Sequence, residues 1–350
     1  MHKGVFYALM AAALFGASTP FAKLLLVHSS PIGVAGMLYL GSGLGLLLWY
    51  ILRAILPRKN GRESTPLKRQ DLPWLSGAVV AGGIAGPVLL MLGLSLTPAS
   101  SASLLLNLEG VLTALLAWFV FKENFDRRIF IGMLLIVAAG ILLSWEQAPA
   151  LGVPWGAIAI AAACLCWAID NNLTRKVAAS DAVQIAGIKG LVAGTVNVTI
   201  ALAMGDTFPE GQTILATGIV GFCGYGLSLV MFVLALRHLG TARTGAYFSA
   251  APFVGAAISL LLPGDTPSPP FWLAAALMGA GIWLHLTEHH EHAHEHETME
   301  HAHAHVHDEH HQHDHEFAWD GKEPHAHAHR HLPLVHAHAH YPDIHHRHGH

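Results

Sequence analysis

The chain has 350 residues, of which 53% are apolar and only 12% are charged. This composition excludes an ordinary soluble domain of that length, because several apolar windows of about 20 residues are long enough to cross a bilayer as helices. The net charge of −4 carries little information, since the apolar part of the chain and its polar tail differ too much in composition to be considered together.

The apolar windows predict about ten membrane spans. In the first half they lie near Gly4–Leu26, Pro31–Leu52, Leu72–Leu96, Ala99–Phe121 and Ile129–Trp145. In the second half they lie near Pro154–Leu173, Val183–Met204, Ile214–Leu236, Gly245–Leu262 and Phe271–Leu286. Because the loops between them are short, consecutive spans are expected to be antiparallel neighbours.

Lysine and arginine residues outside the spans gather on one side of the predicted membrane. The loop Arg53–Asp71 is rich in them, and the same side receives Lys3, Lys122, Arg127, Arg128, Arg175, Lys176, Arg237 and Arg243. The opposite loops, around Ser29, Thr97, Gln147, Asp206 and Pro267, contain no lysine or arginine. The positive-inside rule therefore predicts a multi-pass protein of the inner (plasma) membrane with both termini in the cytoplasm.

The two halves of the chain repeat each other. Phe15–Lys23 aligns with Trp167–Arg175, and Ala99–Val111 aligns with Ala242–Val254. Each half has an odd number of spans, so the second copy enters the membrane from the opposite side, as in transporters built from inverted repeats. We expect an all-α polytopic membrane protein in which residues 1–146 and 147–287 form two inverted five-helix repeats, followed by a disordered tail over residues 288–350.

On these features the chain resembles the EamA-type branch of the drug/metabolite transporter superfamily. The resemblance covers about Lys3 to Leu286. It is carried by Leu94–Ala102 running to Phe121-Lys122-Glu123 and, in the second half, by Leu236, Thr241-Ala242, Ala251-Pro252 and Pro263-Gly264-Asp265. The family implies a ten-helix inner-membrane carrier of small solutes such as amino acids, metabolites or drugs.

Polar side chains inside the spans are the candidates for transport and solute binding. An ionisable group in hydrocarbon costs about 3 kcal/mol on insertion scales, so it normally faces a partner or a water-filled path. The candidates are Asn107, Glu109, Asp170, Asn171, Asn172 and Lys189.

Glu109 lies near the middle of the predicted span Ala99–Phe121, and the internal alignment pairs it with Pro252. Burial in an apolar medium favours the neutral form of a carboxyl group. Glu109 therefore suits a carrier that exchanges protons for solute, because the carboxyl can release its proton when a cation or a polar solute arrives. The alternative is a protonated structural carboxyl that is hydrogen-bonded to a neighbouring helix.

Asp170 and Lys189 are expected to form an ion pair. Each is about two turns from the short loop Lys176–Ala182, so at 1.5 Å per residue they reach a similar depth on neighbouring helices. The pair is either purely structural or a cytoplasmic gate that opens when one partner engages solute. Asn171 and Asn172 offer both donors and acceptors, which suit zwitterionic or amide-bearing solutes and hydrated cations.

Other motifs are typical of helix packing. Gly82-x-x-x-Gly86 and Gly190-x-x-x-Gly194 place small residues one turn apart, which lets helices approach closely. Tyr225 and Tyr247 lie on adjacent spans, where they either line a cavity or serve ordinary packing.

The tail holds most of the 28 histidines of the chain. It alternates histidine with alanine, glutamate and aspartate and has too few aliphatic residues to form a core. Imidazole suits Zn, Ni, Co and Cu, so the tail is expected to bind such metals, although the protein requires no cofactor for transport. The predicted metal ligands are His292, His294, His296, His301, His303, His305, His307, His325, His327, His329, His336, His338 and His340.

Together these patterns predict a secondary transporter of a small solute, proton-coupled through Glu109, with a cytoplasmic metal-chelating tail. The alternatives are a divalent transition-metal carrier and a metal-sensing membrane protein without transport. An enzyme is not expected, because the spans contain no nucleophile–base set, nucleotide motif or metal triad. The expected partners are the lipid bilayer and the solute, with a homodimer as a candidate assembly and no role for nucleic acid.

Overall fold

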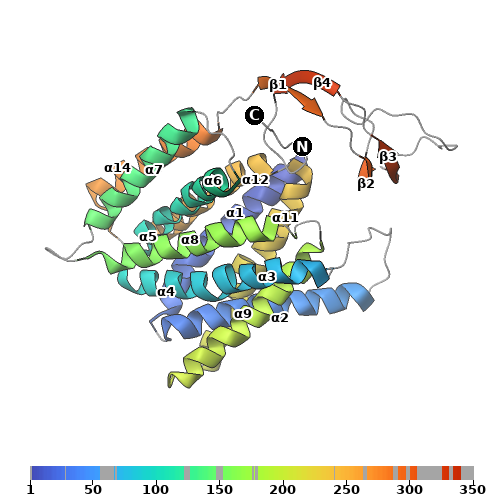
Figure 1. Ribbon diagram of the computed structural model, residues 1–350. Helices are drawn as coiled ribbons and strands as arrows, with labels where there is room; N and C mark the ends of the chain where they lie inside the picture. Colours follow the sequence, from blue (N-terminus) through green and yellow to red (C-terminus); the bar gives the residue numbers. More distant parts are fainter. Residues whose placement is uncertain are drawn as a thin grey trace. The chain divides into compact units, whose positions relative to one another are not determined.

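The computed structural model describes residues 2–27, 29–55, 67, 69–121, 127–146, 153–175, 177, 180–239, 241–262 and 266–286 and, in the tail, residues 291–296, 300–305, 325–330 and 334–339. The chain divides into two compact units, Met1–Glu288 and His289–His350. The first unit is a bundle of helices (Figure 1).

The helices follow the predicted spans in order. The first half contains α1 (His2–Leu25), α2 (Pro31–Ile55), the short 3₁₀ turn η1 (Arg69–Asp71), α3 (Leu72–Ala78), η2 (Val79–Ala85), α4 (Gly86–Leu96), α5 (Ala99–Leu105), α6 (Leu108–Phe121) and α7 (Arg127–Glu146). The second half contains α8 (Trp155–Arg175), α9 (Ala182–Ala203), α10 (Gly211–Gly221), η3 (Phe222–Leu227), α11 (Ser228–Leu239), α12 (Thr241–Phe248), α13 (Ala251–Leu261) and α14 (Pro269–Leu286).

Within the described residues, 7 helices are long and apolar enough to cross a membrane. Shorter apolar helices occupy the remaining predicted positions, at Phe130–Trp145, Ala251–Leu261 and Pro269–Leu284. The prediction of an all-α polytopic membrane protein is confirmed.

The fourth span of each half is broken in the middle. The continuous helix predicted over Ala99–Phe121 is divided at Leu106-Asn107, where i→i+3 hydrogen bonds such as Asn107 N to Leu104 O (3.0 Å) replace the α-helical pattern. The equivalent span of the second half breaks after Phe248. The internal alignment equates these two breaks, because it pairs Asn107 with Ala250. Glu109 consequently stands in the first turn of a new helix, α6, rather than inside a continuous one.

The third span of each half contains a π-helical segment, η2 in the first half and η3 in the second. Both segments are rich in glycine, which tolerates the wider turn and leaves room for a neighbouring helix. The segments contact the first two helices of the opposite half: η2 packs against α8 and α9, and η3 packs against α1 and α2. π-Helical turns inside α-helices are frequent at functional sites.

The first helices of the two halves meet at the centre of the bundle. The ring of Phe15 on α1 packs edge-on against Trp167 on α8, with ring centroids 6.1 Å apart. These are the two residues that the internal alignment pairs with each other. Equivalent residues of two related halves can touch only near the axis that relates them, so Phe15 and Trp167 mark that axis.

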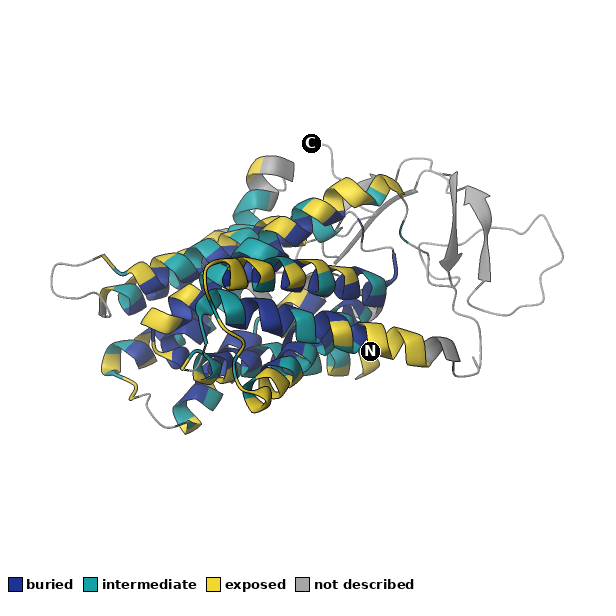
Figure 2. Cartoon of the chain, turned by 90° about the horizontal axis from the view of Figure 1, so that it is seen from below, coloured by how far each residue is buried: buried dark blue, intermediate teal, exposed yellow. Residues whose placement is uncertain are grey.

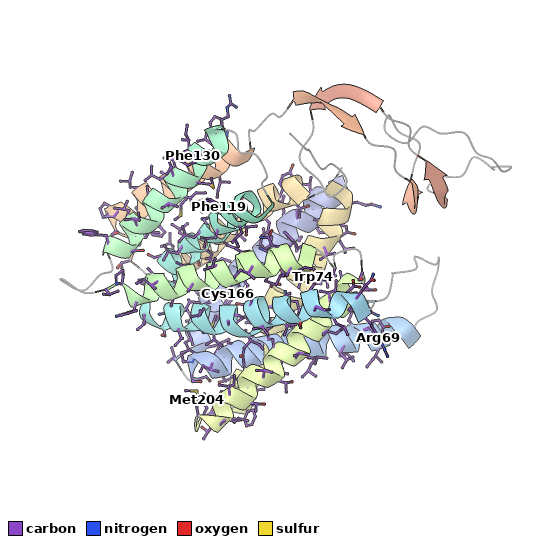
Figure 3. All side chains as sticks on the ribbon, in the orientation of Figure 1. Arg69, Trp74, Phe119, Phe130, Cys166 and Met204 are labelled. Carbon is purple, nitrogen blue, oxygen red and sulfur yellow. The ribbon has the colours of Figure 1, made fainter. Side chains whose placement is uncertain are left out.

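In the helical unit, the side of a helix on which a residue lies decides whether the residue is buried or exposed. Buried positions line the faces that helices turn toward one another, and exposed positions line the faces that turn outward (Figure 2). Large apolar side chains lie on the outer surface, among them Trp74, Phe119, Phe130 and Met204 (Figure 3). Such a surface suits hydrocarbon, because lipid tails are as apolar as the side chains that face them.

Four short segments of the tail pair as strands. The strands β1 (Glu291–His296) and β4 (Leu334–Ala339) form one antiparallel pair, and β2 (Glu300–His305) and β3 (His325–Arg330) form another. Alternation of histidine and alanine has the two-residue period of a strand, and the disorder expected for the tail as a whole stays a prediction. The register sets histidine opposite histidine at 292 and 338, 294 and 336, 301 and 329, 303 and 327, and 305 and 325. Of the predicted ligands, His307 and His340 lie outside the described residues.

A close helix approach in the second predicted glycine motif gives a stability test. A methyl group on Gly190 of α9 would lie 2.6 Å from the backbone nitrogen of Gly43 on α2 and 2.9 Å from the Tyr39 carbonyl oxygen. Neither backbone atom can move away without shifting α2. We expect Gly190→Ala to lower the free energy of unfolding by about 1–3 kcal/mol, the usual cost of overpacking. Thermal unfolding of detergent-purified protein measures it.

Gly279→Ala is the matched control, because α14 leaves open space at Gly279. Alanine is the better helix former, so this control should unfold at the same temperature as the wild type or slightly above it. Equal melting temperatures for Gly190→Ala and Gly279→Ala would contradict the close approach of α2 and α9.

Candidate functional site

The centre of the candidate site is an ion pair between α8 and α9. The Lys189 ammonium donates to both carboxylate oxygens of Asp170, at 2.7 and 2.6 Å, and each side chain is only 8% exposed. The hydroxyl of Thr174, one turn further along α8, also donates to Asp170, at 2.8 Å. This pairing is the one predicted from the equal depth of the two residues on the helical hairpin.

A second polar contact lies beside this pair. The amide of Asn171 on α8 donates to the Glu109 carboxyl group on α6 at 2.8 Å. Glu109 also lies within electrostatic reach of Asp170 and Lys189. Unlike the ion pair, Asn171 is exposed and Glu109 is only partly buried. The cluster therefore has a closed end at Asp170–Lys189 and an accessible end at Glu109–Asn171.

The break in the fourth span explains the position of Glu109. Glu109 stands in the first turn of α6, where the positive end of the helix dipole attracts negative charge. The carbonyls of Leu105 and Leu106 at the same break receive the thiol of Cys164 on α8, at 3.8 and 3.9 Å. α8 thus supplies Cys164 to the break, Asn171 to Glu109 and Asp170 to the ion pair.

The π-helical segment η2 forms the wall behind the ion pair. Gly82 has no side chain, and a Cβ there would overlap the Asp170 carboxylate. Its carbonyl oxygen accepts hydrogen bonds from the Tyr39 hydroxyl at 2.8 Å and from the Trp167 indole nitrogen at 3.0 Å. Asn197 of α9 donates to the next carbonyl, that of Gly83, at 3.4 Å.

Some predicted site residues lie apart from this cluster. The Asn172 amide donates to the Ala168 carbonyl one turn back on its own helix, at 2.8 Å. Asn107 is buried, and its amide donates to the Leu104 carbonyl at 3.0 Å and contacts the Met278 sulfur at 3.6 Å. The structure therefore gathers Glu109, Asp170, Asn171 and Lys189, but not Asn107 or Asn172.

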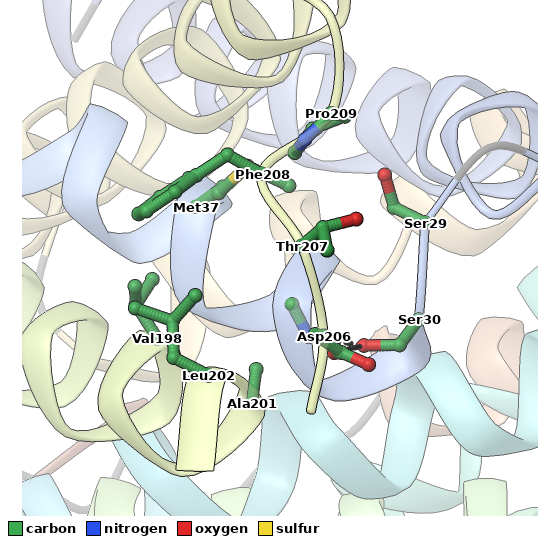
Figure 4. Close-up of a pocket in the computed structure, with 11 residues that line it drawn as sticks. Ser29, Ser30, Met37, Val198, Ala201, Leu202, Asp206, Thr207, Phe208 and Pro209 are labelled. Carbon is green, nitrogen blue, oxygen red and sulfur yellow. Dashed lines mark hydrogen bonds between the residues drawn. The ribbon is translucent and has the colours of Figure 1, made fainter. Parts of the chain in front are cut away.

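A small cavity lies elsewhere, at the ends of α2 and α9. The Ser30 hydroxyl donates to the Asp206 carboxylate across the two loops that border it (Figure 4). Its volume of about 20 Å³ is room for little more than one water molecule. The cavity is too small for a solute, so the polar cluster between α6, α8 and α9 is the better candidate site.

No group of three histidine, cysteine, aspartate or glutamate residues suited to a metal occurs where side chains are described. The predicted metal ligands belong to the tail, whose side chains are outside that part of the structure.

Several residues of the network were not predicted from the sequence. Thr174, Trp167 and Tyr39 contact the ion pair or its wall, and none was a candidate site residue in the sequence. The available signal was the glycine pair Gly82-Gly83, which marks the helix face that receives Asp170. Pro252, aligned with Glu109, also indicated a helix start, since proline is favoured in the first turn.

The two halves of the chain both match one known family of proteins. The EamA-like transporter family matches residues 2–145 and again residues 154–287. The chain belongs to the EamA-like transporter family. This membership confirms the resemblance seen in the sequence and makes the helical unit a transporter built from two repeats.

Relatives from three organisms are similar along most of their length. An uncharacterized transporter of Methanothermobacter thermautotrophicus is 25% identical over 295 residues, covering 80% of this chain and 85% of that protein. The uncharacterized inner membrane transporter YedA of Escherichia coli K12 is 25% identical, with coverage of 78% and 88%. The uncharacterized transporter YyaM of Bacillus subtilis is 24% identical, with coverage of 79% and 91%.

A solved crystal structure shares the fold. It superposes with a TM-score of 0.59 at 16% sequence identity, over 79% of this chain and 94% of that one. At this identity the likeness describes the arrangement of helices alone.

The Asp170–Lys189 pair gives the prediction for this site. Removing one partner leaves a buried charge without compensation, which typically costs about 3–5 kcal/mol. We expect Asp170→Asn and Lys189→Met each to destabilise the protein to this extent, measured by thermal unfolding in detergent.

The double variant carries neither charge, so it should recover most of the stability lost by either single variant. Losses that simply add in the double variant would contradict a direct ion pair.

Proposed function

We propose that this member of the EamA-like family is a secondary transporter that exchanges a small solute for protons through Glu109. The observation that carries the proposal is the position of Glu109, at the accessible end of a buried ionic cluster and at a break in a membrane-spanning helix. Transporters of inverted-repeat architecture commonly place solute and coupling ions at such interrupted helices.

The charges of the cluster support proton exchange. The Lys189 ammonium compensates the Asp170 carboxylate, which leaves Glu109 as the additional acidic group of the cluster. When Glu109 is protonated the cluster is electrically neutral, and when it is ionised the cluster attracts a cation. A solute with a cationic group and the proton of Glu109 would therefore compete for the same place. Solutes of this kind include amino acids, other amine metabolites and drug-like amines.

The Asp170–Lys189 pair is proposed as the cytoplasmic gate of this path. It is buried, held by Thr174, and adjacent in sequence to the Asn171 that contacts Glu109. A solute that draws Asn171 or Lys189 toward itself weakens the contacts that close the pair. A ligand shifts the balance between two states only if it binds one of them more tightly. This change of hydrogen-bond partners supplies that difference, and so links solute binding at Glu109 to opening of the gate.

The orientation of the protein and its location in the inner membrane are part of the same proposal. The lysine and arginine pattern supports both termini in the cytoplasm, and the printed name of YedA places that relative in an inner membrane. Transport by this path requires no cofactor and no enzymatic step. A homodimer stays a prediction.

Proton-coupled flux tests the role of Glu109. Proteoliposomes that hold a pH-sensitive dye are exposed to gradients of aliphatic amines, amino acids and neutral sugars. We expect the wild-type protein to move protons when it receives a cationic solute, and Glu109→Gln to fall to the level of protein-free vesicles, because an amide cannot release a proton.

Glu210→Gln is the matched control, since Glu210 is exposed in a loop before α10. It should retain wild-type proton movement. Proton movement that persists in Glu109→Gln would exclude Glu109 as the coupling group.

The tail is proposed to bind Zn, Ni, Co or Cu in the cytoplasm, separately from transport. The facing histidines of β1 and β4 and of β2 and β3 support it, because residues directly opposite in an antiparallel pair have Cβ atoms about 4.5–5.5 Å apart. Imidazole is a ligand that suits these metals. The alternatives are a carrier whose substrate is the metal itself and a sensor that does not transport.

Metal content of cells separates these alternatives. We compare cells that express the full chain, a version ending at Thr287, and Glu109→Gln. A change in Ni, Co or Zn content that is lost only on truncation identifies a cytoplasmic chelator, as proposed. A change that Glu109→Gln abolishes would instead show that the carrier moves metal.

A further inference from the structure

Tyr225 carries a buried hydroxyl group that the bundle leaves unused. Its side chain is 8% exposed, and its hydroxyl oxygen has no hydrogen-bond partner within the described part of the chain. Ser18 lies near it, but the two do not meet hydrogen-bond geometry, and the Ser18 hydroxyl donates to the Phe15 carbonyl at 2.6 Å. Buried hydroxyl groups are normally hydrogen-bonded, so an unpaired one needs an explanation. A ligand that is bound only part of the time would provide the missing acceptor.

The position of Tyr225 connects it to the transport cluster. Tyr225 lies in the π-helical segment η3, and its ring packs on Tyr39 with centroids 5.4 Å apart. Tyr39 in turn donates to the Gly82 carbonyl, beside the Asp170 carboxylate. A continuous set of contacts therefore runs from the orphan hydroxyl to the ionic cluster.

The internal repeat shows that the Tyr225 side chain has no counterpart in the first half of the chain. The internal alignment pairs the fourth spans, Ala99–Val111 with Ala242–Val254. When the same alignment is extended without gaps into the third spans, Tyr225 is aligned with Gly82. In the first half this position is a glycine whose carbonyl accepts two hydrogen bonds and whose missing side chain makes room for Asp170. In the second half it is a large side chain with a donor to spare. The two π-helical segments therefore differ in chemistry. In η2 the backbone carbonyl of Gly82 is already hydrogen-bonded, whereas in η3 the hydroxyl group of Tyr225 is an unused donor.

We propose that the Tyr225 hydroxyl is a specificity-determining group that donates a hydrogen bond to the solute, so that the solute carries an acceptor as well as an amine. This inference rests on the proposed function, because the amine is the part that Glu109 binds. The solute enters between the repeats, places its ammonium group toward Glu109 and satisfies the orphan hydroxyl with an ether, carbonyl or ring-nitrogen acceptor. A site with a buried donor discriminates strongly against an analogue that lacks the acceptor, since the donor then stays unpaired.

Matched pairs of amines test this directly. One pair is pentylamine and 3-methoxypropylamine, and the other is phenethylamine and 2-(4-pyridyl)ethylamine; the members differ by one acceptor atom. Binding to the full-length protein in detergent is measured by calorimetry. We expect the wild type to bind the acceptor-bearing member at least about tenfold more tightly, as one hydrogen bond to a buried donor allows. In Tyr225→Phe the ratio should fall to about one.

Tyr247→Phe is the control, because Tyr247 is exposed on α12 and should leave the ratio unchanged. Without solute, Tyr225→Phe should unfold at the wild-type temperature or above it, since the orphan hydroxyl has no partner to lose. A lower melting temperature for Tyr225→Phe, an unchanged ratio, or failure of both pairs to bind the wild type would overturn the proposal.

Glu109→Gln separates this inference from the proposed function. This substitution should weaken the binding of both amines of a pair by the same factor. The ratio of their two affinities should stay the same, because Tyr225 binds the acceptor atom. If proton coupling survives in Glu109→Gln while Tyr225→Phe still abolishes the ratio, the coupling role fails and the assignment of Tyr225 stands.

Discussion

The compensation of charge within hydrocarbon constrains this transporter more than any other interaction. Asp170 and Lys189 are almost fully buried, and each would be costly alone in a bilayer, so they hold α8 and α9 in one relative position. The wall that receives them must present backbone rather than side chain, which is why Gly82 stands at the contact. Tyr39 and Trp167 then satisfy the carbonyl that this arrangement exposes. The contacts of α8, α9 and η2 around this point thus enclose one ion pair.

The repeat supplies a symmetric frame on which asymmetric chemistry is placed. Both halves break their fourth span and widen their third span into a π-helix, and Phe15 and Trp167 meet near the axis between them. The ionic cluster belongs to one side of this frame: Glu109 replaces the proline at the equivalent break, and Asp170 replaces Ser18. Alternating access requires two arrangements of similar energy, which a symmetric frame provides. On the proposed mechanism, the asymmetric groups determine which ligand shifts the balance between the arrangements.

The sequence predicted the features that depend on composition and spacing. Apolar windows located the spans, and the equal depth of Asp170 and Lys189 on a hairpin predicted their contact, because helix rise alone determines it. The break at Leu106-Asn107 was missed, since a short apolar run with one polar residue has no strong break signal, although Pro252 at the aligned position was an indication. Tyr39 and Trp167 could not be assigned, because their role depends on the π-helical geometry of η2. The pairing of the tail segments depends on the alternation of histidine and alanine, which composition alone does not describe.

The measurement that tests the central role of Glu109 most directly is proton release on solute binding. Purified protein in weakly buffered detergent solution is titrated with 3-methoxypropylamine while the pH is recorded. We expect the wild type to release up to about one proton per bound amine, because the ammonium group displaces the proton of Glu109. Glu109→Gln should bind the amine more weakly and release none. Equal proton release by both proteins at saturation would contradict the assignment of Glu109 as the group that couples protons to solute.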